Sequence, residues 1–109
     1  MNWTIKYTAQ ALEDLKGIYE YIAFALLSPD TAKHFIEKLK KAVRSLEFMP
    51  EKYKIYDQEP WKSKELRYFP VNNYLVFYCI NKEQHFVNIV RIFYGERDIS
   101  QQLRSLEDI

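Results

Sequence analysis

Residues 65–94 decide the fold of this chain, and they read ELRYFPVNNYLVFYCINKEQHFVNIVRIFY. Their high content of Tyr, Phe, Val and Ile is typical of β-strands, and it predicts three of them, over residues 65–70, 73–80 and 85–94. Asn72-Asn73 and residues 81–84 supply the turns. Because connections this short join antiparallel neighbours, the sequence predicts an antiparallel meander.

The last of these strands carries apolar residues on both of its faces. Alternation assigns one face to Val87, Ile89 and Phe93, and the other to Phe86, Val90, Ile92 and Tyr94. We therefore expect a central strand that is covered on both sides.

Arg91 interrupts this apolar strand. An unpaired guanidinium is costly to bury, so Arg91 must reach a carboxylate, for example that of Asp98 or Glu96, or the open face of the sheet. The sequence leaves both possibilities open.

One strand and two helices are predicted in the first half of the chain. The strand covers residues 3–7, which alternate apolar and polar side chains, as a strand with one buried face does. Thr8 can then cap a helix whose apolar residues recur at three-and-four spacing as far as Leu26. A second apolar stripe runs over residues 32–46.

The two helices are separated by a short break. Ser28 can cap the second helix, and Pro29 suits its first position. So short a connection predicts an antiparallel helix hairpin. With a possible short helix in the tail at 98–106, the chain is expected to form one α+β domain, residues 1–109, with the order β-α-α-β-β-β.

Composition excludes several classes of protein. With 48% hydrophobic residues in 109, the chain is expected to bury a core rather than remain disordered. The N-terminus lacks a signal-peptide pattern and no apolar run could cross a bilayer, so we expect a cytoplasmic protein that does not bind membranes. The net charge of +1 does not by itself indicate a nucleic-acid binder.

Cofactor and metal chemistry are also disfavoured. Two glycines are too few for a phosphate loop or a dinucleotide fingerprint, so no cofactor is expected. His34, His85 and Cys79 occur singly in separate elements, so no metal site is expected. Cys79 alternates with Leu75 and Phe77, and we interpret it as a small core residue rather than a nucleophile.

Arginines and tyrosines gather around the predicted sheet: Arg67, Tyr68, Tyr74, Tyr78, Arg91, Tyr94 and Arg97. Guanidinium groups suit the recognition of phosphate or of acidic side chains. A second set consists of aromatic residues in excess of what a small core can hide, which we expect to form a protein-binding surface: Trp3, Tyr53, Tyr56 and Trp61.

Two motifs carry a resemblance to a known family. Residues 66–78 read LRYFPVNNYLVFY and residues 90–98 read VRIFYGERD, and Ala11-Leu12-Glu13-Asp14-Leu15 fits as well. Over roughly residues 3–103 the chain resembles the RelE/ParE superfamily of bacterial type II toxin-antitoxin toxins. The resemblance implies two antiparallel helices packed on a twisted antiparallel sheet, and a toxin that a cognate antitoxin wraps and neutralises.

The superfamily contains two activities. The RelE-like branch cleaves messenger RNA on the ribosome, and the ParE-like branch poisons DNA gyrase. As a nuclease this chain would use Arg67, Arg91, Tyr94 and Arg97 as its catalytic residues. As a target-binding toxin it would use Lys62, Lys64, Arg67 and Arg97.

The motifs favour the ParE-like branch. Leu75 stands where the nucleases carry an arginine, and Leu103 falls near the position of their late tyrosine. A ribosome-dependent endoribonuclease remains the alternative, and a relative that binds antitoxin with little toxicity is a third possibility. For the partner we expect a small acidic antitoxin that forms a hetero-oligomer with the chain and folds along its helix-sheet groove.

Overall fold

A computed structural model describes residues 2–106 of the chain. Within that range the sheet has four strands in the order β1-β4-β3-β2. Their bounds are β1 Thr4–Tyr7, β2 Arg67–Val71, β3 Tyr74–Asn81 and β4 Phe86–Tyr94. The antiparallel meander β2-β3-β4 is confirmed, and β4 is a central strand as predicted.

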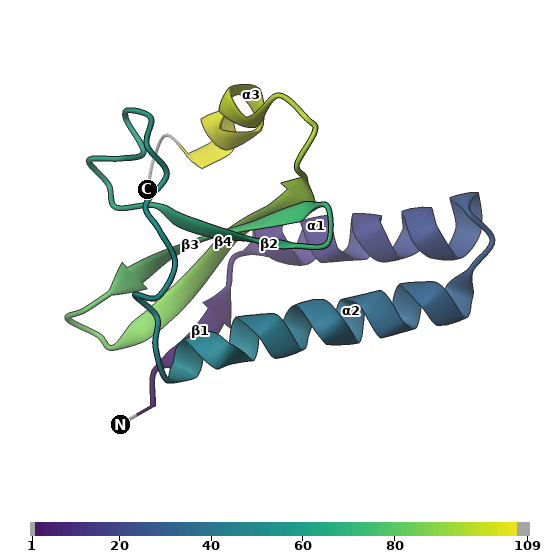
Figure 1. The fold of residues 1–109 in the computed structure, drawn as a ribbon, viewed down its shortest axis with the longest axis horizontal. Helices are drawn as coiled ribbons and strands as arrows, with labels where there is room; N and C mark the ends of the chain where they lie inside the picture. The colour runs from purple at the N-terminus through teal and green to yellow at the C-terminus, as the bar shows by residue number, and fades with distance from the viewer. Residues whose placement is uncertain (1, 107–109) are drawn as a thin grey trace.

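The first strand joins this sheet in the other direction. β1 pairs with β4 in parallel, with Thr4 opposite Phe86 and Tyr7 opposite Ile89. A parallel pairing requires a long crossover, and the two helices between β1 and the meander provide it. In Figure 1 these helices lie side by side against one face of the sheet.

The predicted helix hairpin is confirmed, with one local difference. Helix α1 (Ala9–Glu20) continues into a π-helical turn, η1 (Tyr21–Ala25), and α2 (Pro29–Arg44) ends in a 3₁₀ turn, η2 (Ser45–Glu47). Thr8 caps α1 by accepting a 3.0 Å hydrogen bond from the backbone N–H of Ala11.

Ser28 occupies the predicted N-cap position of α2, but its side chain does not cap the helix. Its hydroxyl donates to the carbonyl of Leu26 at 3.2 Å instead of accepting from α2. Pro29 does occupy the first turn of α2, where its missing N–H costs no helical hydrogen bond.

A β-bulge in β4 changes which residues face the helices. Phe77 lies opposite Arg91, while its neighbour Tyr78 lies opposite Ile89, so Val90 is an extra residue in the ladder. The strict alternation predicted for β4 is therefore wrong beyond Ile89. Ile92 packs with the helix-side core, whereas Phe93 packs on the opposite face.

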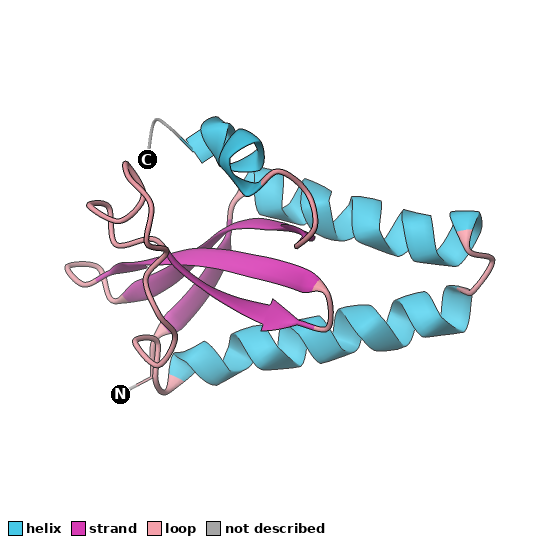
Figure 2. Cartoon of the chain, turned by 45° about the horizontal axis from the view of Figure 1, so that its top comes forward, coloured by secondary structure: helices cyan, strands magenta, loops and turns pink. Residues whose placement is uncertain are grey.

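Both faces of the sheet carry a core. The helix-side core lies under α1 and α2 and includes Leu15, Leu39, Val76, Tyr78 and Ile89. The outer core is covered by residues 51–66 and by the C-terminal turns α3 (Ile99–Leu103) and η3 (Arg104–Leu106), and it consists of Trp61, Leu66, Phe77, Val90, Phe93, Leu103 and Leu106. In Figure 2 the sheet lies between α2 and these C-terminal turns.

Among residues 2–106, no helix combines the length and the apolar character that crossing a bilayer requires. The hairpin of α1 and α2 extends past the sheet, so that its far end projects beyond the rest of the molecule (Figure 1).

Candidate functional site

Arg91 is buried, with 6% of its surface exposed, and it ties three elements together. Its Nε donates to Asp14 Oδ2 at 2.8 Å and one Nη2–H to Asp14 Oδ1 at 3.3 Å. Nη1 donates to the Gln102 carbonyl at 2.5 Å and to Ser105 Oγ at 3.1 Å, and Nη2 also reaches Gln102 Oε1 at 3.2 Å. All five N–H groups of the guanidinium thus have an acceptor within the chain.

Asp14 has a second role at the edge of the sheet. Its Oδ2 also accepts the backbone N–H of Ile92 at 2.9 Å. β4 extends past the end of β1 here, so this N–H would otherwise lack a strand partner. One carboxylate therefore neutralises Arg91 and caps the open edge of β4.

The two acids suggested by sequence proximity do not pair with Arg91. Asp98 caps α3 by accepting from the backbone N–H of Gln101 at 3.2 Å. Glu96 hydrogen-bonds the Tyr94 phenol. Asp14 precedes Arg91 by 77 residues, so no local pattern could indicate this pair.

Arg67 hydrogen-bonds the loop that follows η2. Its Nη1 donates to the carbonyls of Glu51 and Tyr53 at 3.2 and 2.6 Å. The neighbouring phenol of Tyr78 donates to the carbonyl of Pro50 at 2.7 Å, and burial raises its pKa. Together the two side chains hold the start of the segment that runs from α2 to β2.

Lys62 and Lys64 lie on that same segment. The Lys62 ammonium is 3.1 Å from Asp57, and both side chains are largely exposed. The Lys64 ammonium lies 5.5 Å from the ring centre of Trp61.

Tyr94 and Arg97 lie where β4 ends. The ring of Tyr94 packs edge-on against Tyr74, with centroids 5.6 Å apart. The negative charge of Glu96 raises the pKa of Tyr94, so its phenol stays protonated at neutral pH. The backbone N–H of Arg97 donates to the Tyr94 carbonyl at 3.1 Å, and its side chain is exposed.

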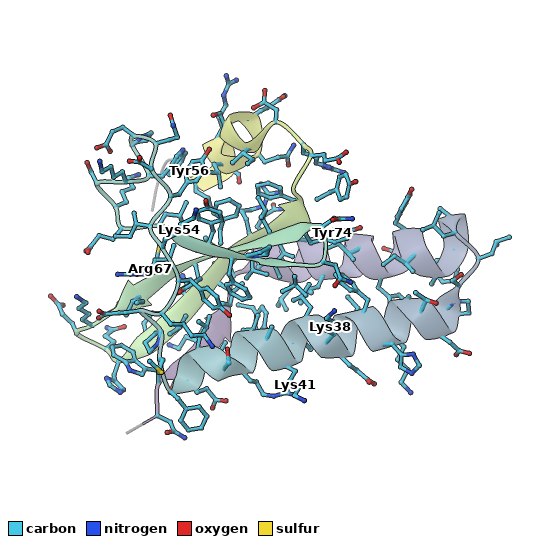
Figure 3. All side chains as sticks on the ribbon, viewed as in Figure 1. Lys38, Lys41, Lys54, Tyr56, Arg67 and Tyr74 are labelled. Atoms are coloured by element: carbon cyan, nitrogen blue, oxygen red, sulfur yellow. The ribbon has the colours of Figure 1, made fainter. Side chains whose placement is uncertain are left out.

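These residues do not meet around one point. Arg67 pairs with Tyr78 across the β2-β3 ladder, and Tyr94 pairs with Tyr74 across the β3-β4 ladder. Tyr74 and Tyr78 are four residues apart on β3, which separates the two pairs by about 13 Å along the strands. Figure 3 shows Arg67 and Tyr74 at opposite ends of the sheet.

A groove of about 840 Å³ runs between α1 and the end of β4. Its lining includes Gly17, Ile18, Tyr21, Tyr74, Tyr94 and Arg97. The sequence had identified Tyr94 and Arg97 as site residues but not Gly17 or Tyr21, which belong to the helix pattern. The i, i+4 spacing of Glu13, Gly17 and Tyr21 is the signal that could have indicated a common helix face.

The exposed apolar surface is not where the sequence placed it. Trp61 is 4% exposed in the outer core, Tyr53 stacks on Phe69 at 4.3 Å, and Trp3 stacks on His85 at 3.9 Å. The side chains of Trp3, Tyr53 and Trp61 therefore pack within the fold. Five of the large exposed apolar side chains lie instead around the far end of the hairpin, at Tyr19, Tyr21, Phe24, Leu26 and Leu27, and Phe48 and Met49 are exposed just after η2.

Cys79 is partly buried and packs against the outer core. Burial raises the pKa of Cys79 to about 11, so its thiol is protonated at neutral pH and is a poor nucleophile. In the described part of the chain no three His, Cys, Asp or Glu side chains come together as a metal site would need.

Comparison with solved structures shows the same fold elsewhere. The chain is similar to one in the chromosomal ParDE toxin-antitoxin system from P. aeruginosa, with a TM-score of 0.71, 20% identity, and 86% of this chain and 97% of that chain covered. A double mutant of the E. coli toxin RelE in the free state matches at a TM-score of 0.66 and 13% identity, with 100% of both chains covered.

A further match is the RelBE2 toxin-antitoxin complex from Mycobacterium tuberculosis, with a TM-score of 0.58, 20% identity, and 86% of this chain and 99% of that chain covered. Comparison with curated protein sequences gives no match.

The family follows from the sequence itself. The family model of the ParE toxin of the type II toxin-antitoxin system parDE matches residues 5–99. That range contains both long helices and all of the sheet except Thr4, the first residue of β1. The chain belongs to the ParE toxin family and is the toxin of a type II toxin-antitoxin module.

Proposed function

We propose that this toxin arrests bacterial growth by binding an essential target such as DNA gyrase, without cutting nucleic acid, and that a cognate antitoxin neutralises it. One observation carries the proposal. Of the four residues that this chain would use as a nuclease, Arg67 lies at one end of the sheet and Tyr94 and Arg97 lie at the other, and Arg91 between them has no free donor.

RNA cleavage by a neighbouring 2′-hydroxyl makes three demands. It needs a group that activates the hydroxyl, cations beside the phosphate and a proton donor for the leaving oxygen. Arg91 is saturated by protein acceptors, and Nη1 of Arg67 is held by two carbonyls. Tyr94 and Arg97 remain adjacent, and two residues supply too few of the required roles.

The proposed target contact centres on Arg97. Its guanidinium is exposed at the end of the groove. By contrast, Arg67 donates a hydrogen bond to the loop carbonyl of Tyr53, and the ammonium of Lys62 lies beside the carboxylate of Asp57. An exposed, planar donor fork suits the carboxylates and phosphates of a macromolecular target. We propose Lys62, Lys64 and Arg67 as secondary contacts on the neighbouring surface.

The antitoxin proposal draws on the similar structures. The ParDE and RelBE2 chains come from toxin-antitoxin systems, and the latter was solved as the complex. A toxin of the same family with exposed apolar side chains on its helix hairpin is suited to a permanent protein partner.

Induced expression in a bacterial host tests the proposed function. We expect filamentation and a DNA-damage response, with transcripts left intact, and no arrest when the protein encoded by the adjoining gene is expressed together with the toxin. Arg97→Ala is expected to relieve the arrest while the purified variant melts within a few degrees of the wild type, since exposed substitutions change stability by about 0.5 kcal/mol or less.

Two other outcomes of induced expression would contradict the proposed function. Rapid loss of translation with transcripts cut within codons would establish the nuclease in place of the proposed function. A chain that causes no growth defect at all would point to a relative that retains antitoxin binding without toxicity.

A further inference from the structure

Positive charge is concentrated on one helix of this nearly neutral chain. Helix α2 contains five of the sixteen Lys and Arg residues and two of the fifteen acids. The other residues carry eleven cations against thirteen acids, so the rest of the chain is net negative at neutral pH. The net charge of +1 therefore conceals a basic face on α2, formed by Lys33, Lys38, Lys40, Lys41 and Arg44.

The basic face lies on the side of α2 that is turned away from the core. All five of its side chains are exposed, whereas Leu39 on the opposite side of the helix is fully buried. Lys33, Lys40 and Arg44 follow i, i+7, i+11 spacing, so they form one row about 16 Å long. In Figure 3 Lys41 extends from α2 away from the sheet.

No carboxylate neutralises the basic face. The ion pairs among residues 2–106 all lie outside α2, and Glu37 forms none with its neighbours on the helix. Lys38 donates to Asn72 Oδ1 at 2.7 Å, and this amide carries no charge. Lys52 adds a sixth cation at the end of the helix, where its ammonium donates to Ser45 Oγ at 2.9 Å. The charge of this surface is therefore available to an anion outside the chain.

The stability of the helix does not explain this concentration of charge. Lys40 and Arg44 lie one turn apart, and like charges at this spacing repel each other. The helix dipole favours Lys41 and Arg44 in the last turn, but its effect falls off within that turn and does not extend to Lys33. The fold thus gains nothing from placing cations along the whole row.

The side chains around the basic face narrow the class of anion. Phe35 of α2 is buried, so its ring cannot stack on the exposed bases of a single-stranded nucleic acid. Leu39 and Val43 are also buried, which leaves α2 no apolar face of its own for a lipid interface. Double-stranded DNA presents about one negative charge per 1.7 Å of its axis. A straight row of exposed cations suits such a regular array of phosphates.

We propose that the basic face of α2 binds the phosphate backbone of double-stranded DNA without regard to base sequence. Lys33, Lys40 and Arg44 place their charges against the phosphates, and Lys52 extends the contact past the end of the helix. No residue of α2 lines the groove that contains Arg97, so the toxin can hold DNA and its protein target at the same time. DNA binding of this kind goes beyond the proposed function and does not depend on it.

Fluorescence anisotropy of a labelled DNA duplex, titrated with purified toxin, measures this binding. We expect the logarithm of the affinity to fall with the logarithm of the salt concentration with a slope of about −4, since about five phosphates are neutralised. Lys40→Gln combined with Arg44→Gln is expected to weaken binding at least tenfold at low salt and to reduce the size of the slope by about 2. Lys33→Gln combined with Lys41→Gln is a second variant of the same face and is expected to behave alike.

A matched control removes one lysine and one arginine from the surface proposed for the target. Lys62→Gln combined with Arg97→Gln is expected to bind the duplex within threefold of the wild type. Since the altered residues are all exposed, every variant is expected to melt within a few degrees of the wild type. If the control loses as much affinity as the α2 variants, the basic face is not the binding surface.

Three other results would overturn the assignment to duplex DNA. One is no binding by the wild type at about 100 μM toxin, the weak end of the usual non-specific range. Another is equally tight binding to a single strand of the same length. The third is binding to phosphatidylglycerol vesicles but not to the duplex, since Phe48 and Met49 are exposed just after η2 and could enter a membrane surface. A toxin that binds the duplex through α2 without arresting growth would contradict only the proposed function.

Discussion

Arg91 illustrates how one residue can resemble a site and serve the fold. It lies in the arginine-rich half of the chain, and the sequence left open whether it pairs with a carboxylate or reaches the open face of the sheet. In the structure it joins β4 to α1 through Asp14 and to the C-terminal turns through Gln102 and Ser105. The guanidinium of Arg91 is enclosed and serves the fold, whereas the guanidinium of Arg97 is exposed to solvent.

A double-mutant cycle tests the Arg91–Asp14 pair. Arg91→Ala and Asp14→Ala are each expected to cost about 3–5 kcal/mol, because each leaves an unpaired buried charge. Arg91→Ala combined with Asp14→Ala is expected to cost clearly less than the two single losses added together, because neither charge is then left buried without its partner. Urea denaturation of the four proteins measures these values, and strictly additive losses would show that the pair is not coupled.

At the scale of elements, the sequence predicted what depends on local pattern and missed what depends on register. The meander followed from Asn72-Asn73 and the strand composition, and the cap at Thr8 followed from its place before an apolar stripe. The bulge at Val90 did not follow, because a one-residue slip is decided by how β3 and β4 fit together. That slip exchanged the predicted faces of Ile92 and Phe93, so that Ile92 packs in the helix-side core and Phe93 in the outer core.

Helix α1 offers a prediction at the same scale. Gly17→Ala should raise the free energy of unfolding by about 1 kcal/mol, since it removes a helix-interior glycine and the new methyl group meets open space. Thermal melts of the purified toxin measure this change. A variant no more stable than the wild type would mean that the helix is not continuous at Gly17.

At the scale of the whole molecule, the sequence supplied the residues of the candidate site but not their separation. Arg67, Arg91, Tyr94 and Arg97 are all in or beside neighbouring strands, so a sequence pattern can group them. The distance between the Arg67 end and the Tyr94 end depends on the register of β3 with both of its neighbours. The same is true of the groove, because Gly17 and Arg97 meet it only after α1 has packed along β4.

The exposed aromatic surface was misplaced for a related reason. Trp61 lies outside the predicted helices and strands, yet its side chain fills the space between the sheet and the C-terminal turns. Most of the large apolar side chains that stay exposed belong to the helix hairpin, whose far end projects beyond the sheet (Figure 1). The order of elements could be predicted without these tertiary contacts, but the position of the exposed apolar surface could not.

The most direct measurement uses purified toxin with two purified candidate targets, DNA gyrase and a ribosome programmed with messenger RNA. We expect the toxin to bind gyrase, Arg97→Ala to weaken that binding at least tenfold, and the messenger RNA to stay intact after long incubation. Cleavage of the ribosome-bound message by the wild-type chain, abolished by Arg97→Ala, would contradict a toxin that acts by binding alone.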